Sequence, residues 1–331
     1  MVPLHYRIIA TLLLLLAALL PTSGPPPLRP ANRAPQPAPA PLAGTTIVTA
    51  YFRVATSKHT PEAFLSRMRT FFSQVGPNVV VFTTPDLRPV IAAMDRGGLP
   101  PVRFILQDTV WNSTWAQRLE HDFRTVQRRL DFGNAAPELY AIWSSKAAWL
   151  ADVAAANPFS TRFFLFVDAG SQRAPGLNFA PWPSEARVAA LFEGRAERAL
   201  VSTVAPFDAR WDWRRVWPHR GTQIQGAIFG GAAGAVAWLN ATYWRTFEEL
   251  RARGLFAAQE QGVLSVLAVE HTERLLILDA GGGARGNGCS LSNWFYFWAY
   301  LQAPGTGDAR CVAVPVHVYE QSVATLYPPP P

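Results

Sequence analysis

Cysteine is scarce in this sequence, and its charge is modest and evenly spread. The chain has 2 cysteines in 331 residues, which excludes a small scaffold held together by many disulfides. Charged residues make up 16% of the chain, and the formal net charge of +7 is not gathered into a basic run. We interpret this charge as a solvated, weakly basic surface and expect no nucleic-acid partner.

Lysine and several common catalytic motifs are also missing or nearly so. Lys58 and Lys146 are the two lysines among 30 basic residues. No P-loop with its lysine and no Gly-x-Ser-x-Gly motif occurs, and the 6 histidines lack the spacing of metal ligands. The sequence therefore disfavours a P-loop NTPase, a serine or cysteine hydrolase and a histidine-rich metal centre.

Residues 1–23 have the composition of a targeting segment. His5 and Arg7 precede an uncharged, leucine-rich run over Ile8–Leu20, and Pro21 ends the run. This length suits the core of a signal peptide better than a full membrane span of about 20 residues. Because no clear small-x-small cleavage site follows, a short signal anchor, and with it an N-terminal membrane attachment, stays an alternative.

Further segments complete the predicted domain organisation. Residues 24–44 are rich in proline and alanine and predict an extended linker. Residues 45–327 carry the pattern of one folded domain, and residues 328–331 are a proline tail. An anchor followed by a proline-rich stem is the layout of a type II membrane protein. We therefore expect a catalytic domain in the lumen of the Golgi or the endoplasmic reticulum, with secretion as the alternative.

Two kinds of residue agree with a lumenal address. Asn112 and Asn240 each begin an Asn-x-Thr tripeptide, the acceptor pattern of N-glycosylation. In an oxidising compartment Cys289 and Cys311 would pair and close a loop of about 20 residues, worth roughly 3 kcal/mol in the chain-entropy model. In a cytosol the same two residues would be free buried thiols.

Apolar strands alternate with helical segments along the folded part. Repeated units of this kind predict an α/β fold, a doubly wound mixed sheet with right-handed crossovers and helices on both faces. The predicted strands are 46–52, 78–84, 102–107, 163–167, 198–203, 222–229, 275–278 and 312–319. The predicted helices are 61–75, 87–96, 111–130, 138–156, 235–253 and 259–269.

The strand predicted over Phe163–Val167 is the centre of the domain. Its apolar residues do not alternate with polar ones, which is typical of a strand covered on both faces. The strand ends at Asp168, which Ala169 and Gly170 follow. In open α/β sheets ligands bind at the carboxyl ends of strands, so Asp168 predicts a seat for a metal ion and the phosphates that it carries. The alternative is that Asp168 merely starts a turn.

Polar side chains end two other strands at the same predicted edge. Thr49 and Tyr51 lie at the end of the first strand, and Thr83 lies at the end of the second. Together with Asp168 they would line one crevice, where hydroxyl and carboxylate groups could hold a nucleoside. Thr and Asp are also ordinary capping residues at strand ends, and this alternative stays open.

The C-terminal half contains three segments whose residues could bind a ligand or take part in catalysis. Gly230 and Gly231 are predicted to form a turn between a strand and a helix, where backbone amides can meet an anion or a hydroxylated ligand. Trp213 lies among arginines, and such a segment either stacks on sugar rings or packs its tryptophans inward. Glu260 and Gln261 open a helix, and they either cap it or point into the crevice.

Several segments of the chain resemble, in sequence and in order, the HtrL/YibB family, whose members are placed beside the GT-A glycosyltransferases. The resemblance covers nearly all of residues 45–280. The resembling segments are TIVTAYF (46–52), NVVVFTT (78–84), ELYAIWSSKAAWL (138–150), NPFSTRFFLFVDAG (157–170), IQGAIFGG (224–231) and QEQGVL (259–264).

The resemblance implies a GT-A-like fold and transfer of a sugar from a nucleotide sugar to a glycan or another hydroxyl acceptor. In GT-A enzymes an Asp-x-Asp motif holds Mn²⁺ or Mg²⁺ on the donor diphosphate. Asp168 matches the first carboxylate, whereas Gly170 occupies the second position. His317 lies where some such enzymes have a late metal ligand, and Glu260 and Gln261 are similar to an acidic-Gln pair on the acceptor side.

We therefore expect a lumenal glycosyltransferase. Asp168, through a divalent ion, would stabilise the leaving diphosphate, and Glu260 would be the base for the acceptor hydroxyl. The expected donor-binding residues are Thr49, Tyr51, Thr83, Lys146 and Arg173, and the expected acceptor-side residues are Gly230, Gly231, Gln261 and Trp213. The alternative, favoured by the missing second carboxylate, is a non-catalytic protein of the same fold that binds a glycan or a nucleotide.

Overall fold

One sheet of eight strands, ordered β3-β2-β1-β4-β6-β5-β7-β8, carries the fold in this computed structural model. The structure describes residues 44–54, 59–94, 96–131, 133, 135–174, 176–204, 223–279, 291, 293–303, 305 and 317–319, all within the unit Leu42–Pro331. The strands are β1 (Thr45–Tyr51), β2 (Asn78–Thr83), β3 (Val102–Leu106), β4 (Phe163–Val167), β5 (Ala199–Thr203), β6 (Ile224–Ala232), β7 (Leu275–Asp279) and β8 (His317–Tyr319).

The strand directions make the sheet a mixed one. β3, β2, β1 and β4 are parallel neighbours in that order. β6 is antiparallel to both β4 and β5, β7 is parallel to β5, and β8 is antiparallel to β7. The carboxyl ends of β1, β2 and β4 therefore meet at one edge of the sheet.

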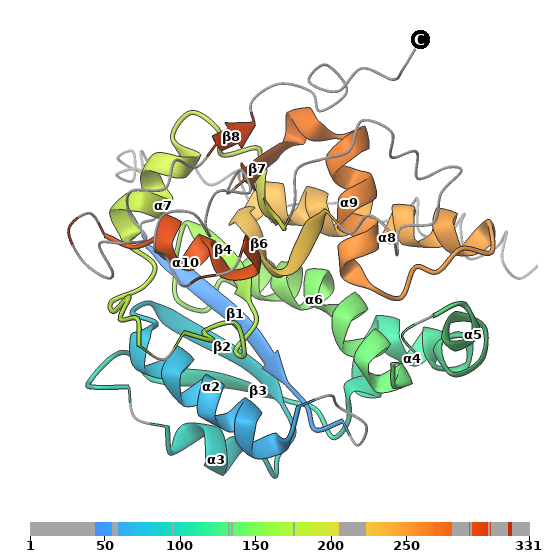
Figure 1. Ribbon diagram of the computed structural model, residues 1–331, viewed down its shortest axis with the longest axis horizontal. Helices are drawn as coiled ribbons and strands as arrows, with labels where there is room; N and C mark the ends of the chain where they lie inside the picture. The colour runs from blue at the N-terminus through green and yellow to red at the C-terminus, as the bar shows by residue number, and fades with distance from the viewer. Residues whose placement is uncertain are drawn as a thin grey trace, which may run out of the picture. The chain divides into compact units, whose positions relative to one another are not determined.

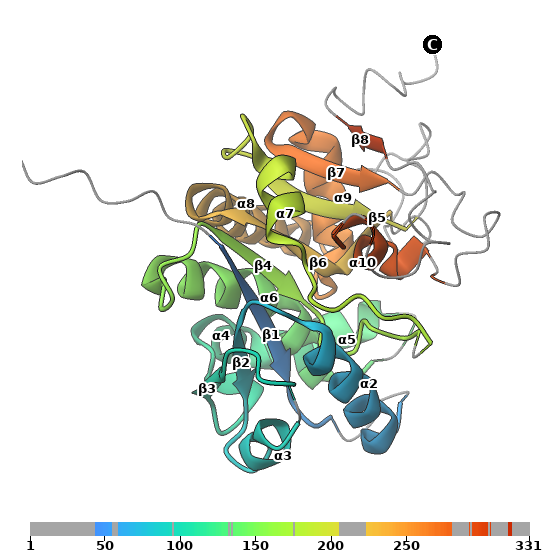
Figure 2. The same cartoon turned by 90° about the vertical axis from the view of Figure 1, so that its left-hand side faces the viewer.

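Helices cover both faces of the sheet, as Figures 1 and 2 show. Apolar side chains of α4, α6, α8 and α9 form the core on one face, and those of α2, α3, α7 and α10 form the core on the other. The prediction of an α/β fold with a doubly wound mixed sheet is therefore confirmed. The helices are α2 (Pro61–Gln74), α3 (Arg88–Ala92), α4 (Thr114–Asp122), α5 (Arg128–Leu130), α6 (Pro137–Ala156), α7 (Glu185–Phe192), α8 (Ala233–Ala252), α9 (Glu260–Glu270) and α10 (Phe297–Tyr300).

The junction from α6 to β4 sets the geometry of the central strand. Asn157 ends α6 in the left-handed region, with φ of 38°, a conformation that Asn tolerates better than most residues. Its side chain accepts a hydrogen bond from the backbone N–H of Thr161 and donates one to the carbonyl oxygen of that residue. β4 follows with every residue buried, as its apolar run predicts. These two hydrogen bonds hold the turn that leads from the end of α6 to the start of β4.

Two predicted boundaries are wrong. Gly230 and Gly231 lie inside β6 and not in a turn, because β6 continues to Ala232 and α8 begins directly at Ala233. At φ of 155°, Gly230 passes so close to the backbone of β4 that a Cβ atom would collide with it. The helix predicted over 111–130 is instead divided into the 3₁₀ turn Val110–Asn112, α4, a π-helical turn Phe123–Gln127 and α5.

Several predictions lie outside the described residues. They concern the targeting segment, the linker, the proline tail, Trp213 and both cysteines. Of His317 the structure describes the backbone in β8. No helix within the described ranges is long and apolar enough to span a membrane.

Candidate functional site

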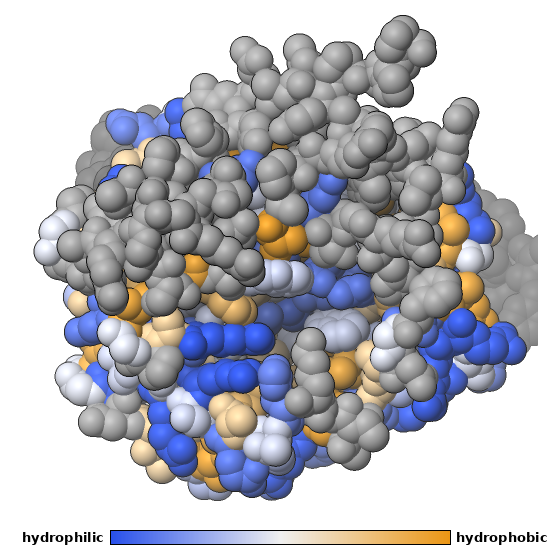
Figure 3. Space-filling view, viewed as in Figure 1, coloured by the Kyte–Doolittle hydropathy of each residue, from blue (hydrophilic) through white to orange (hydrophobic). Residues whose placement is uncertain are grey.

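A cavity of about 540 Å³ opens at the carboxyl ends of β1 and β4. Residues after β1, the start of α2, the first half of α6 and the loop after β4 form its walls. In the space-filling view hydrophilic side chains gather in a hollow on this face of the molecule (Figure 3). This is the edge at which α/β sheets bind their ligands.

Lys146 joins two carboxylates at the floor of the cavity. Its Nζ lies 2.6 Å from Oε1 of Glu260 and 2.9 Å from Oδ1 of Asp168. It also donates a hydrogen bond of 3.0 Å to the carbonyl oxygen of Gly226. The side chains of Lys146 and Glu260 are 3% and 5% exposed, whereas that of Asp168 is 38% exposed. We call Lys146, Asp168 and Glu260 the Lys146 cluster.

Burial and charge act against each other in the Lys146 cluster. Burial lowers the pKa of Lys146, but Asp168 and Glu260 outweigh it and raise that pKa above its ordinary value. Burial also raises the pKa of Glu260, and the neighbouring charge of Lys146 opposes this rise. The two carboxylates therefore favour the protonated form of Lys146, and the charge of Lys146 favours the ionised form of Glu260.

Gly226 in β6 leaves room for the buried side chain of Glu260. A Cβ atom at Gly226 would collide with the carboxylate of Glu260, so this approach requires glycine. Glu260 is also the first residue of α9, where the helix dipole favours a negative charge. Its Oε2 atom is buried and finds no hydrogen-bond partner in the described part of the chain.

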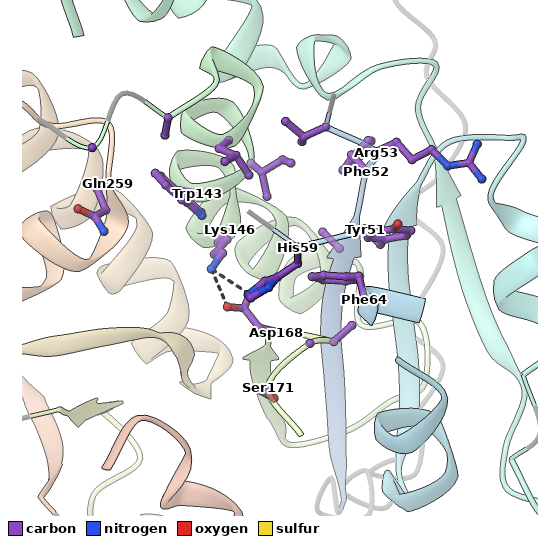
Figure 4. A pocket seen from close by; sticks show the side chains of 18 of the residues that line it. Tyr51, Phe52, Arg53, His59, Phe64, Trp143, Lys146, Asp168, Ser171 and Gln259 are labelled. Atoms are coloured by element: carbon purple, nitrogen blue, oxygen red, sulfur yellow. Dashed lines mark hydrogen bonds and ion pairs between the residues drawn. The ribbon is translucent and has the colours of Figure 1, made fainter. Parts of the chain in front are cut away.

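The side chains around Asp168 come from opposite walls (Figure 4). The ring of Tyr51 stacks on that of Phe64, with centroids 4.7 Å apart and an angle of 11° between the planes. Trp143 and Gln259 lie on the other side of Lys146, and both line the cavity. The cavity thus offers a flat aromatic wall near β1 and an aromatic and amide wall near α6 and α9.

Arg173 lies on the loop that follows β4 and also lines the cavity. Its Nε donates a hydrogen bond of 3.2 Å to the carbonyl oxygen of Gly170, and its Cζ lies 4.7 Å from the ring centroid of Phe295. Burial lowers the pKa of Arg173, and the charge of Arg67 lowers it further, while Asp168 raises it. Arg173 is thus a positioned cation near Asp168.

The predicted donor-binding residues divide into two groups. Tyr51, Lys146 and Arg173 line the cavity together with Asp168. Thr49 and Thr83 are instead buried within the sheet and do not line it. Thr83 donates a hydrogen bond of 2.8 Å to the carbonyl oxygen of Tyr51, which is a structural contact between β2 and β1.

Of the predicted acceptor-side residues that the structure describes, none lines the cavity. Gly230 and Gly231 pair with Leu165 and Phe164 in the first half of β4, toward the end opposite Asp168. The expectation of a ligand-binding glycine turn near Asp168 is wrong, because these residues are paired strand. Gln261 is buried in α9, and its side chain accepts a hydrogen bond from that of Gln259.

The structure puts Glu260 next to Lys146 but not on the cavity wall. Lys146 contacts both Asp168 and Glu260, and of these three residues Asp168 and Lys146 line the cavity. This arrangement differs from the expected role of Glu260 as a base that touches the acceptor. An acidic residue at the start of a helix does not show from sequence alone whether its side chain is exposed or buried.

The described residues do not make up a divalent-metal site. Both oxygens of Asp168 are within reach of the ammonium of Lys146, at 2.9 and 3.1 Å, and Gly170 contributes no carboxylate. Within the described ranges no group of three His, Cys, Asp or Glu side chains could hold a metal ion. Mn²⁺ and Mg²⁺ require oxygen ligands, and this donor set has a cation where a metal would lie.

The N-glycosylation predictions concern residues on α8 and near α4. Asn112 is exposed, and its side-chain oxygen accepts hydrogen bonds from the backbone N–H and the hydroxyl of Thr109. Asn240 is half-buried on α8. Their modification stays a prediction.

Sequence reasoning missed several cavity residues. Phe64, Trp143 and Gln259 line the cavity, and none of them was singled out from the sequence. One signal was available, because Trp143 and Lys146 are three residues apart and share a face of α6. The approach of Phe64 to Tyr51 depends on tertiary packing and has no counterpart in the sequence.

Comparisons with known proteins give similarities among solved structures. No protein-family model and no curated protein matches the chain. Among solved structures, the apo form of mouse xyloside xylosyltransferase 1 is similar at a TM-score of 0.44 and 12% sequence identity. The match covers 71% of this chain and 84% of that protein's chain.

Proposed function

We propose that the protein is a glycosyltransferase of GT-A-like fold, related to the HtrL/YibB family, that transfers a sugar from a nucleotide sugar to a hydroxyl acceptor such as a glycan. The observation that carries the proposal is the Lys146 cluster at the end of β4, where a buried cation and a partly exposed carboxylate meet a cavity. The cavity, about 540 Å³, has the size of a small-molecule site.

The reaction makes two electrostatic demands on this cavity. The bond between the anomeric carbon and a diphosphate oxygen breaks, so negative charge grows on the leaving diphosphate. A new bond forms to the acceptor oxygen, whose proton must leave. Lys146 and Arg173 supply positive charge, and Asp168 is the partly exposed carboxylate at which the proton would be accepted.

Glu260 acts as a positioning residue in this proposal. Its carboxylate holds the ammonium of Lys146 at 2.6 Å and keeps that group charged at the cavity floor. The stacked rings of Tyr51 and Phe64 offer a flat surface on which a nucleobase could stack. Trp143 and Gln259, on the other side of Lys146, would then face the acceptor.

A panel of nucleotide sugars tests the proposal directly. The purified protein is incubated with each nucleotide sugar, and release of the nucleoside diphosphate is measured with and without simple glycans. We expect release from at least one donor, faster when a suitable acceptor is present. The absence of release from every donor, together with no thermal stabilisation by any of them, would contradict both transfer and donor binding.

The second candidate is a non-catalytic protein that binds a glycan or a nucleotide. The observation that favours it is the ammonium of Lys146, which lies within hydrogen-bond distance of both oxygens of Asp168. The same panel separates the two candidates, because a binding protein would be stabilised by a nucleotide or a glycan and release no product.

The secretory location is part of the proposal and rests on residues 1–44. We propose that the domain works in the Golgi or endoplasmic reticulum lumen, attached through its N-terminal segment or released after cleavage. Protease protection of the full chain in sealed microsomes tests this, and digestion of the domain without detergent would contradict it.

A further inference from the structure

Arg173 lies on the loop that follows β4, and Arg67 lies on α2, the helix that packs against this loop through Phe64. Arg67 lies on α2 one turn after Phe64, whose ring packs against Gly170 so closely that a Cβ atom there would be 3.0 Å from it. Arg173 lies three residues after Gly170 and bonds to its carbonyl oxygen. The two guanidinium groups are close enough that the charge of Arg67 adds to burial in lowering the pKa of Arg173.

Among the described residues, neither arginine has an acidic partner of its own. In the part of the chain that the structure describes, no carboxylate forms an ion pair with Arg67 or Arg173. The Nη1 atom of Arg67 is buried, and no described residue gives it a hydrogen-bond partner. The Nε atom of Arg173 bonds to Gly170, and Phe295 packs against its guanidinium plane, so the group is held in a fixed orientation.

This arrangement is unfavourable in the free protein and becomes favourable with an anion. Two like charges repel each other, and a buried N–H group without an acceptor adds to the cost. A phosphate oxygen removes both costs, because guanidinium groups bind phosphate through parallel, charge-assisted hydrogen bonds. A diphosphate has oxygens enough to contact both groups at once.

Arg67 and Arg173 lie near Gly170, the residue at the position of the second carboxylate in an Asp-x-Asp motif. Gly170 occupies the second position of the expected Asp-x-Asp motif, and both the Phe64 ring and Arg173 contact this residue. No side chain with a negative charge fits there without displacing Phe64. Fixed positive charge is therefore present beside the place where the residues needed for a metal ion are absent.

We propose that Arg67 and Arg173 form a binding site for a diphosphate group and that this site works without a divalent metal ion. The inference deepens the proposed function, on which it rests for the identity of the ligand as the diphosphate of a nucleotide sugar. Arg67 is a binding residue in this view, although it is absent from the cavity wall of the free protein.

Binding of inorganic pyrophosphate to the full chain tests the site. Affinity is measured by isothermal titration calorimetry in excess EDTA for the wild type and for Arg67→Gln, Arg173→Gln and Arg69→Gln. Arg69 is the matched control, because it is an exposed arginine on the same helix. We expect metal-free binding that weakens at least tenfold in Arg67→Gln and Arg173→Gln and changes less than twofold in Arg69→Gln.

Two results overturn the inference. One is binding that occurs only after Mn²⁺ or Mg²⁺ is added, and the other is equal affinity of Arg67→Gln and Arg69→Gln. If Arg173→Gln fails to fold, as its packing on Phe295 allows, Arg67→Gln decides alone. Loss of pyrophosphate binding in Arg67→Gln, in a protein that cleaves no nucleotide sugar, would uphold this site while refuting the proposed transferase.

Discussion

Replacing Lys146 by methionine removes a charge from the centre of the molecule while keeping the length of the side chain. Glu260, at 5% exposure, then loses the ammonium that pairs with it, so the folded variant must either keep an unpaired buried charge or take up a proton. Breaking a buried ion pair on one side costs about 3 to 5 kcal/mol, whereas Asp168, at 38% exposure, is solvated and adds little. We therefore expect Lys146→Met to lower the free energy of unfolding by about 3 to 5 kcal/mol at pH 7.

A double-mutant cycle separates the pair from other effects. Glu260→Gln removes the buried charge, so the variant Lys146→Met/Glu260→Gln should recover about 2 to 3 kcal/mol of what Lys146→Met loses. Urea unfolding followed by fluorescence of the 12 tryptophans measures all four proteins. Additive losses in the two single variants, or a loss below about 1 kcal/mol in Lys146→Met, would refute the reasoning.

The loss in Lys146→Met should also depend on pH. Burial raises the pKa of Glu260 in the folded protein, and removing Lys146 takes away the group that opposes this rise. The folded variant then binds a proton that the unfolded chain releases above its ordinary pKa of about 4.3. Its stability should fall as pH rises from there through the raised folded pKa, so the deficit is smaller at pH 5 than at pH 8.

Three other substitutions test the packing at two glycines and the glycosylation expected in the secretory pathway. Gly226→Ala places a Cβ atom against the carboxylate of Glu260 and should cost about 1 to 3 kcal/mol in urea unfolding. Gly234→Ala is the control and should cost less, because no described atom outside its own helix lies within 4 Å of the added Cβ. Gly170→Asp restores the Asp-x-Asp sequence, but its Cβ atom would lie 3.0 Å from the ring of Phe64. We therefore expect a loss of about 1 to 3 kcal/mol in the free energy of unfolding and no Mn²⁺ binding by calorimetry. Tight Mn²⁺ binding would contradict this. Asn112→Gln should increase the gel mobility of the secreted or membrane-bound protein by the mass of one endoglycosidase-sensitive glycan. An unchanged mobility would exclude glycosylation at Asn112.

The sequence pattern was sufficient to predict the mixed sheet and two residues of the candidate site. The apolar run before Asp168 and the scarcity of lysine pointed to two members of the Lys146 cluster. Their direct contact could not be predicted, because it depends on how α6 packs against β4. The same holds for Glu260, whose burial depends on a glycine in another strand.

The wrong predictions have a common physical origin. Gly230 and Gly231 were assigned to a turn because glycine commonly ends strands, but here glycine is needed for close approach of β6 to β4. Thr49 and Thr83 were assigned to a crevice from their position at strand ends, yet both face the packed interior. In each case the sequence shows a glycine or a threonine at the end of a strand, but the tertiary structure determines which residues lie next to it.

The most direct test of sugar transfer is the turnover of a nucleotide sugar by Asp168→Asn. This variant keeps the size of the side chain and loses the charge that faces the cavity, and Asp86→Asn, at an exposed carboxylate of 62% exposure, is its control. The account predicts that kcat falls at least about a hundredfold in Asp168→Asn, as expected for loss of a general base, while Asp86→Asn is unchanged. Equal kcat in the wild type and in Asp168→Asn, with both folded, would contradict it.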